Sequence, residues 1–232
     1  MKRFWKETSI SEDPDGFTIN LDGRPVRTPA RHACRVPRRL MAEEIAAEWQ
    51  AQEEVVSPLS MPMTRVAATC LDRVAPEMDA VRDMITAYGG TDLLCYRATH
   101  PAELIARQTA GWDPVLDWAA ETVGARLKTG SGVMHIAQPP SAEDALARRV
   151  RDADAWTLTG LSELVTISGS LVLGLAVLEQ FLEAEAAWEL SRIDEQWNID
   201  EWGEDFEAAE LAAKRQSDFL QAARVLDILR TQ

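Results

Sequence analysis

The stretch FTINLDGRPVRT, residues 17–28, decides the fold of the first part of this chain. The positions that alternate with polar residues are Phe17, Ile19 and Leu21 before a turn and Val26 and Thr28 after it. The pair Asp22-Gly23 between them is typical of a tight two-residue turn. A period of two indicates half-buried strands. We therefore predict a β-hairpin, within a run of short strands from about Lys2 to Val36.

One helix is expected after the strands, opened by Pro37. The residues that can share one face of it are Leu40, Ile45, Ala46 and Trp49. Because Trp49 follows Ile45 by four residues, we expect a buried, structural indole rather than a direct contact with a partner. Pro58 and Pro62 then interrupt any regular element. We place a domain boundary here, with a β-rich domain at residues 1–62 and a second domain at 63–232.

The second domain is predicted to be a helical bundle without a further strand pair, which makes the fold class α+β. The helices expected from the periodicity cover residues 66–74, 78–88, 101–112, 113–127, 142–155, 157–179 and 204–229, with an acidic helix before the last. Residues 164–178, LVTISGSLVLGLAVL, carry no charge. As a helix they would span about 22 Å at 1.5 Å per residue, less than the roughly 30 Å of a bilayer core. We expect a buried central helix and no stable membrane insertion.

The composition excludes several classes of function. The formal charge is −14, from 38 acidic and 24 basic residues, whereas binding of nucleic acid needs clustered Lys and Arg. The three cysteines are far apart, so we expect neither a disulfide framework nor a Cys-x-x-Cys metal site. The first residues lack the apolar core of a secretory signal. A bacterial cytoplasm is the predicted location, or the mitochondrial matrix for a processed organellar protein.

The sequence offers little for catalysis. His32, His100 and His135 stand apart from one another, and the chain has no phosphate-binding loop, dinucleotide fingerprint or nucleophile elbow. A carboxylate cluster around Glu183 and Glu195 suggests a metal centre, but di-metal bundles need Glu-x-x-His pairs that are missing here. Nothing indicates the sugar cleft that a glycosidase would need. We predict no enzyme, no catalytic residue, no metal and no cofactor.

The most unusual segment is IDEQWNIDEWGEDFEAAE, residues 193–210. Between Glu179 and Glu210 the chain has twelve carboxylates and one base, Arg192. A charge run of this kind is usually a solvated helix face, but large amphipathic indoles are enriched in interface hot spots. We therefore predict a partner-binding surface. The candidate residues are Asp194, Glu195, Trp197, Glu201 and Trp202.

Other prominent residues have structural interpretations. Asp92 and Asp113 both stand where a helix is expected to begin, so we predict that they cap helices. Gly203 is predicted to end the acidic helix in a left-handed conformation. We expect the indole of Trp202 to pack against the bundle, and the carboxylates of the acidic helix to remain free for a basic partner surface.

Several ordered motifs carry a family resemblance. They are FWK (4–6), LDGRPVRTP (21–29), EWQAQ (48–52), MPMTR (61–65), Asp72-Arg73, TDLLCYRA (91–98), WDPVLDW (112–118) and DEWG (200–203). With these motifs the chain resembles the assembly chaperones that bind the free alpha subunit of the F-type ATP synthase head. It departs from the family pattern at Asn198, where glutamine is frequent, and at Glu201, where a basic residue is frequent. Contacts made by these two side chains must differ in detail.

The resemblance implies a chaperone that binds the unassembled alpha subunit, prevents its aggregation and hands it on for assembly with beta. It also implies a β-rich first domain and a helical second domain. We expect a monomer. The alternatives are an acidic scaffold or regulatory module with another protein partner, and an enzyme built on a carboxylate cluster.

Overall fold

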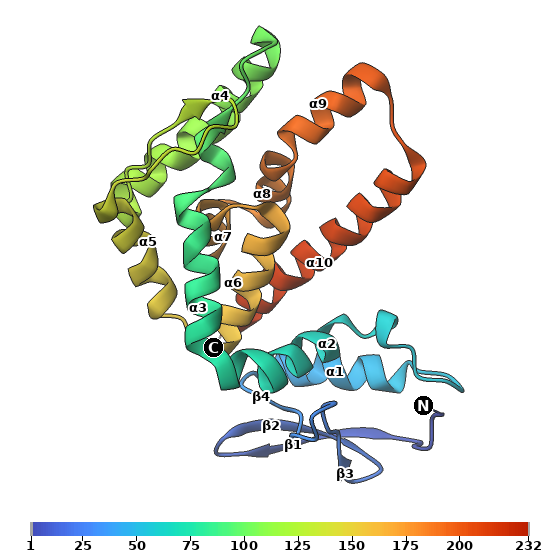
Figure 1. The fold of residues 1–232 in the computed structure, drawn as a ribbon. Coiled ribbons are helices and arrows are strands. Elements are labelled where there is room, and N and C mark those ends of the chain that lie inside the picture. Colours follow the sequence, from blue (N-terminus) through green and yellow to red (C-terminus); the bar gives the residue numbers. More distant parts are fainter. Residues whose placement is uncertain (1, 232) are drawn as a thin grey trace. The chain divides into compact units, whose positions relative to one another are not determined.

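The computed structural model describes residues 2–231, which form two compact units (Figure 1). The first unit contains the chain up to Met78, the segment Ala155–Gly160 and the chain from Arg224 onward. The second unit contains Asp79–Asp154 and Leu161–Ala223. Two long helices therefore contribute to both units. The domain boundary after residue 62 stays a prediction.

The first unit is built on a small antiparallel sheet. Its strands are β1 (Thr8–Asp13), β2 (Gly16–Leu21), β3 (Arg24–Pro25) and β4 (Arg35–Val36), and β2 pairs with each of the others. Leu21 lies opposite Arg24 across the turn, where Asp22 and Gly23 have φ values of 46° and 77°. Two positive φ values are characteristic of the type I′ hairpin turn. The predicted hairpin is confirmed.

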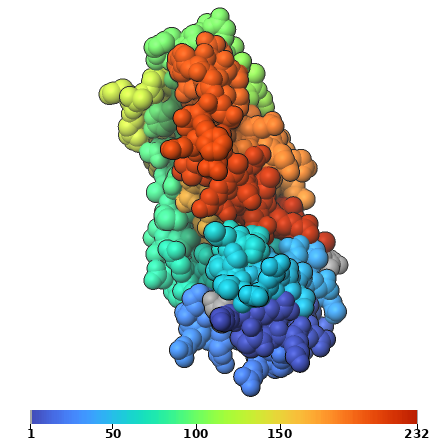
Figure 2. All heavy atoms as spheres, turned by 90° about the vertical axis from the view of Figure 1, so that its right-hand side faces the viewer, coloured from blue at the N-terminus to red at the C-terminus, as the bar shows by residue number. Residues whose placement is uncertain are grey.

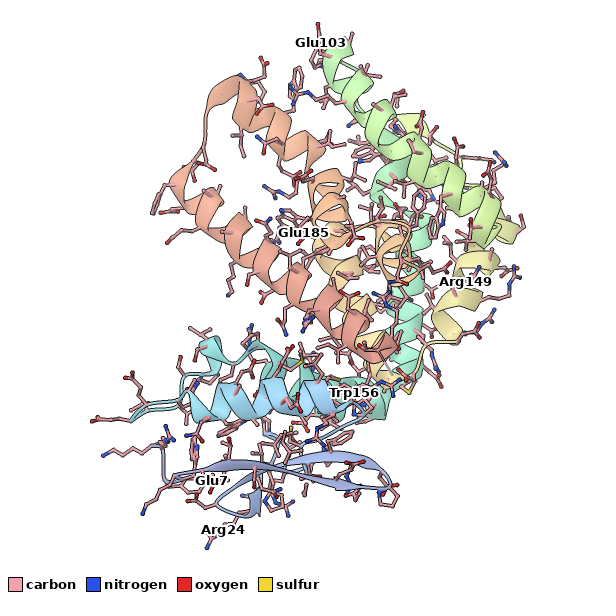
Figure 3. The ribbon with its side chains drawn as sticks, turned by 180° about the vertical axis from the view of Figure 1, so that it is seen from behind. Glu7, Arg24, Glu103, Arg149, Trp156 and Glu185 are labelled. Atoms are coloured by element: carbon pink, nitrogen blue, oxygen red, sulfur yellow. The ribbon has the colours of Figure 1, made fainter. Side chains whose placement is uncertain are left out.

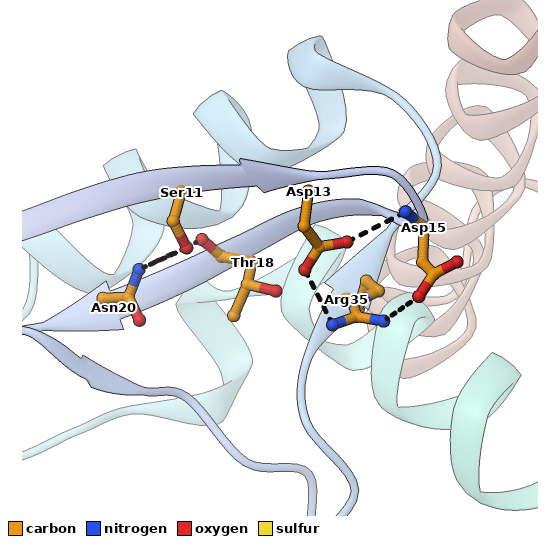
Figure 4. A network of polar contacts seen from close by, with 6 residues as sticks. All are labelled: Ser11, Asp13, Asp15, Thr18, Asn20 and Arg35. Carbon is orange, nitrogen blue, oxygen red and sulfur yellow. Dashed lines mark hydrogen bonds and ion pairs between the residues drawn. The ribbon is translucent and has the colours of Figure 1, made fainter.

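A polar network fastens the other end of this sheet (Figure 4). Arg35 on β4 donates hydrogen bonds to Asp13 at 2.8 Å and to Asp15 at 3.1 Å, on both sides of the turn that joins β1 to β2. The Asn20 amide donates to Ser11 Oγ at 3.0 Å across the same two strands. Side-chain hydrogen bonds therefore link β1, β2 and β4 in addition to the backbone pairing.

Helix α1 (Arg39–Gln50) covers this sheet (Figure 1). The residues that it buries are Met41, Ala42, Ile45 and Trp49. The Trp49 ring meets Trp5 edge to face at 5.2 Å, and only 9% of Trp49 is exposed. The buried position predicted for Trp49 is confirmed. Leu40 is exposed instead of facing the core, because at about 100° per residue it lies roughly 140° around the helix from the buried Ile45.

The rest of the first unit is helical. It consists of a short turn at Pro58–Ser60, α2 (Pro62–Thr69), a π-helical turn at Cys70–Val74 and a 3₁₀ turn at Ala75–Glu77. Met63 and Ala67 of α2 belong to the same core as the buried residues of α1. The segment Ala155–Gly160 adds the partly buried Trp156, which is labelled in Figure 3, and the end of the chain adds Val225 and Ile228. Residues far apart in the sequence thus share one core.

The second unit is almost entirely helical, which confirms the α+β fold class. Its longer helices, in chain order, are α3 (Met78–Thr86), α4 (Ala102–Trp118), α5 (Pro140–Arg151), α6 (Ala155–Ser168), α7 (Leu171–Leu178), α8 (Ala184–Ser191), α9 (Ile193–Trp202) and α10 (Phe206–Arg230). Short 3₁₀ or π turns occupy Ala87–Gly90, Leu93–Cys95 and Ala119–Val123. Two parallel strands, β5 (Tyr96–Arg97) and β6 (Gly130–Ser131), form a pair that the sequence analysis did not expect.

Two helix predictions are wrong. α4 runs without a break through Asp113-Pro114, where the sequence predicted a boundary between two helices. Burial of Trp112, Val115 and Trp118 along one face explains why tertiary packing overrides the proline there. The expected central helix over 157–179 is instead divided into α6 and α7 at Gly169, whose φ is +74°.

The apolar segment has the buried position that was predicted. Every residue from Leu171 to Val177 is buried. Gly174 permits close packing, since a Cβ placed there would lie 2.8 Å from Val165 and 3.1 Å from Leu161 on α6. Within residues 2–231, none of the helices is long and apolar enough to cross a bilayer.

Candidate functional site

The acidic segment occupies α9 and the start of α10, and the atoms of both helices lie uncovered on the face shown in Figure 2. From Ile193 to Trp202, none of the residues of α9 is buried. The N–H of Gly203 donates to the carbonyl of Ile199 at 2.9 Å and ends the helix, as predicted. Its φ of +87° comes with a ψ of 166°, so the conformation is extended and not the left-handed helical one that was expected.

Asp194 is an anchor of α9. The side chain of Gln108 on α4 donates to Asp194 Oδ1 at 2.6 Å, and Gln108 is completely buried. The same amide accepts a hydrogen bond from the N–H of Ala98 at 2.8 Å. One oxygen of Asp194 is therefore engaged within the unit, whereas a carboxylate free of internal contacts was predicted here.

Trp197 and Asp200 are both held by Arg107 on α4. The guanidinium carbon lies 4.8 Å from the centre of the Trp197 ring, and Nη1 donates to Asp200 Oδ2 at 2.6 Å. The amide of Gln196 donates to the other oxygen of Asp200 at 2.9 Å. Hydrogen bonds from Arg107 first, and then from Gln196, hold the pKa of Asp200 below its usual range. One face of Trp197 is thus covered by a cation from its own chain.

Three of the candidate residues present side chains to solvent. Glu195 lies 3.5 Å from Arg192, but its side chain is 51% exposed. Glu201 is exposed, and 79% of Trp202 is accessible. The prediction that the Trp202 indole packs against the bundle is wrong. None of residues 193–202 is fully buried, and Trp202 stands at the solvent-exposed end of this helix.

A groove lies between α8, α9 and the first half of α10. Its volume is about 330 Å³. The lining residues are Trp188, Glu189, Arg192, Gln196, Ile199, Glu204, Asp205, Ala208, Ala209, Ala212, Ala213 and Gln216. Glu185, an exposed carboxylate that is labelled in Figure 3, lies on α8 with Trp188 and Glu189 but is not among the lining residues. The groove combines an apolar floor with acidic side chains.

The capping prediction holds for Asp92 and fails for Asp113. Asp92 is fully buried and accepts hydrogen bonds from Leu94 N at 3.1 Å, Ser170 Oγ at 2.7 Å and Val172 N at 3.0 Å. It therefore also supports the start of α7. Burial raises the pKa of this carboxyl to about 6. Asp113 lies inside α4 and instead accepts a 2.7 Å hydrogen bond from Arg97 on β5.

In the first unit, four of the family motifs are in contact in two pairs. Asp72 accepts hydrogen bonds from Thr28 Oγ1 at 2.5 Å, Ala30 N at 2.9 Å and His32 Nδ1 at 2.9 Å, which joins Asp72-Arg73 to the LDGRPVRTP segment. Glu48 of EWQAQ accepts from the backbone N–H groups of residues 63 and 64 and from the Thr64 hydroxyl. These motifs hold the unit together, a role that the sequence analysis did not assign to them.

Residues 2–231 contain no group of three or more His, Cys, Asp or Glu side chains placed to hold a metal. Cys34, Cys70 and Cys95 are all buried. Burial raises the pKa of Cys34 and of Cys95 to about 12, so both remain thiols at neutral pH.

Comparison with known proteins agrees with the motifs. The family profile described as ATP12 chaperone protein matches residues 2–120. The mitochondrial protein atp12 of Schizosaccharomyces pombe is 22% identical over 237 residues, which cover 97% of this chain and 81% of the relative. A crystal structure of Atp12 from Paracoccus denitrificans is 43% identical with a TM-score of 0.95, covering 99% of this chain and 98% of that one.

A second solved structure, the Agrobacterium tumefaciens protein Atu1473, is also 43% identical. It matches with a TM-score of 0.94 over 99% of this chain and 86% of that one. Sequence and fold therefore agree along nearly the whole length. The chain belongs to the ATP12 chaperone family, the family of ATP synthase assembly chaperones that its motifs resemble.

Proposed function

We propose that this protein binds the unassembled alpha subunit of the F-type ATP synthase head, prevents its aggregation and releases it for assembly with beta. A free subunit exposes the surface that its neighbour later covers, and exposed apolar surface promotes aggregation. Family membership supports the role in assembly. The protein acts by binding, as a monomer and without a cofactor, in the cytoplasm of a bacterium.

The observation that carries the proposal is the acidic segment. Residues 193–210 contain eight carboxylates and no Lys or Arg, and they present Trp202 to solvent. Glu195, Glu201 and Trp202 are the proposed contacts, whereas Asp194 and Trp197 act by holding α9 in place. Carboxylates steer a basic partner and disfavour wrong ones, while an indole contributes burial energy. Release then follows from competition by beta for the same surface.

The direct test uses purified alpha subunit. We expect the protein to form a complex with alpha on a sizing column and to reduce light scattering by alpha at a one-to-one ratio. Serum albumin at the same concentration is the control for unspecific protection. A folded protein that neither binds alpha nor lowers its scattering contradicts the proposal. A native-lysate pull-down that yields another protein in place of alpha favours the acidic scaffold alternative.

A further inference from the structure

The groove beside the acidic segment has room and chemistry for part of another chain. Its floor is formed by four alanines of α10, namely Ala208, Ala209, Ala212 and Ala213, together with Ile199 and Trp188. Small side chains let a second backbone approach closely. About 330 Å³ lies at the low end of known binding pockets, so it accommodates a few side chains of one segment and not a folded domain.

Two large aromatic side chains are exposed beside this groove. At the corner between α9 and α10, Trp202 is 79% exposed and Phe206 is 76% exposed. Glu204 and Asp205, which lie between them in the sequence, line the groove. Exposed aromatic residues close together on a folded protein mark an interaction site. The groove and its corner therefore form one candidate surface.

The charged side chains of the lining indicate which kind of segment the groove binds. Three carboxylates line the groove, on Glu189, Glu204 and Asp205. The one cation in the lining is Arg192, which is ion-paired with Glu195 at 3.5 Å and lies 5.4 Å from the centre of the Trp188 ring. The remaining negative charge favours an apolar segment that carries Lys or Arg.

We infer that this groove takes one short segment of the client, with apolar side chains on the floor and flanking Lys or Arg residues at the acidic rim. The inference rests on the proposed function, because it assigns that segment to the alpha subunit. An apolar helix face inserted between helices is a common mode of peptide recognition. The carboxylates of α9 recognise charge, and the groove beside them recognises the shape of the bound segment as well.

Photo-crosslinking tests which face of α10 meets the client. One variant carries p-benzoylphenylalanine in place of Ala208, an exposed residue that lines the groove. The matched control carries it in place of Leu211, which is 55% exposed and is not among the lining residues. We expect irradiation to join the first variant to alpha and not the second. The captured peptide should be apolar with Lys or Arg beside it.

A second measurement fills the groove. Ala212→Trp should weaken binding of alpha by about tenfold or more, since it occupies the space of an interface anchor. Leu211→Trp adds an indole to the same helix outside the groove and should bind like the wild type. Circular dichroism establishes that each variant is folded. If Ala212→Trp fails to fold, the crosslinking pair decides.

The outcomes separate the two claims. Three crosslinking results overturn the inferred groove site while the wild type still captures alpha. They are crosslinks only from position 211, an acidic captured peptide, and a second copy of this chain as the product. Each of them leaves the proposed function standing. Unchanged affinity of a folded Ala212→Trp variant also overturns the groove site. If the wild type does not capture alpha at all, the proposed function fails and the inference fails with it.

Discussion

At the scale of single residues, the half-buried carboxylate of Glu48 and the buried one of Asp92 serve the backbone. Glu48 accepts hydrogen bonds from the first N–H groups of α2. Asp92 accepts hydrogen bonds from an N–H group of the 3₁₀ turn Leu93–Cys95 and from one at the start of α7. Burial raises the pKa of both side chains. Each carboxylate accepts hydrogen bonds from helix-end N–H groups that have no partner within their own helix. Removing either carboxylate leaves those donors without this partner.

Trp49 provides a first test at this scale. Trp49→Arg places a charge in the core beside Trp5 and removes a large apolar group, at a cost of roughly 3–5 kcal/mol. We expect insoluble protein or a strongly lowered melting temperature. Trp202→Arg, at an exposed position, is the control and should melt like the wild type. A Trp49→Arg variant with unchanged melting would contradict the buried placement.

Asp92 should make stability depend on pH. Its pKa rises from an ordinary 3.8 to about 6 on folding because of burial, so the folded state binds the proton more tightly than the unfolded state. The contribution of this group to the free energy of unfolding is therefore largest below about pH 4, falls as the pH rises to about 6 and is constant above that.

Comparison with Asp92→Asn isolates this contribution, since all other carboxylates are common to both proteins. The substitution should destabilise by about 1–3 kcal/mol, because an amide N–H₂ replaces an oxygen that accepts hydrogen bonds. Its cost, from urea unfolding, should be larger at pH 4.5 than at pH 7. An equal cost at both values, or a larger one at pH 7, would refute the assignment.

At the scale of elements, α9 is held against α4 by polar and cation–π contacts. The contacts are those of Arg107 with Trp197 and Asp200, and of Gln108 with Asp194. Such partly exposed ion pairs and cation–π contacts contribute little each, about 0.5–1 kcal/mol. Together they determine where the acidic helix lies without adding a large apolar core.

Arg107→Ala should therefore loosen α9 selectively. We expect faster amide hydrogen exchange over residues 193–202, with a change of about 1 kcal/mol or less in global unfolding. Binding of alpha should weaken because the proposed contacts are no longer held in position. Arg126→Ala, at another exposed arginine, is the matched control. Unaltered exchange in α9 would show that α4 does not hold this helix.

At the scale of the whole molecule, negative charge is concentrated on one segment. Eight of the 38 acidic residues fall within 193–210, where no base offsets them. Salt screens such exposed charges within about 8–10 Å, so association with a basic surface should weaken as ionic strength rises. The long-range part of recognition therefore belongs to α9 and the start of α10.

Charge reversal tests this assignment. Glu195→Lys and Glu201→Lys should change stability by about 0.5 kcal/mol or less, because both side chains are exposed. Each should weaken binding of alpha and reduce its sensitivity to salt. Glu121→Lys makes the same charge change at an exposed position outside the segment and should have a smaller effect. Wild-type affinity at two salt concentrations in both variants would refute the proposed surface.

The sequence by itself determined those features of the fold that depend on residues a few positions apart. The hairpin at Asp22-Gly23, the buried Trp49 and the cap at Asp92 follow from turn chemistry, helical periodicity and side-chain reach, which act over a few positions. The family motifs likewise lie in short, ordered segments. These features could be predicted because their physical causes are local.

Only the tertiary structure decided how the candidate site is divided between anchors and free groups. Arg107 and Asp200 are 93 positions apart, and Gln108 and Asp194 are 86 apart, so no local pattern reveals that they meet. Burial along α4 likewise outweighed the helix break expected at Pro114. Trp202 is exposed because the contacts of α9 with α4 are made by residues earlier in the helix, such as Asp194 and Trp197. Contacts between distant helices form only when the chain folds. They determine which charged side chains are paired within the protein and which remain exposed to solvent.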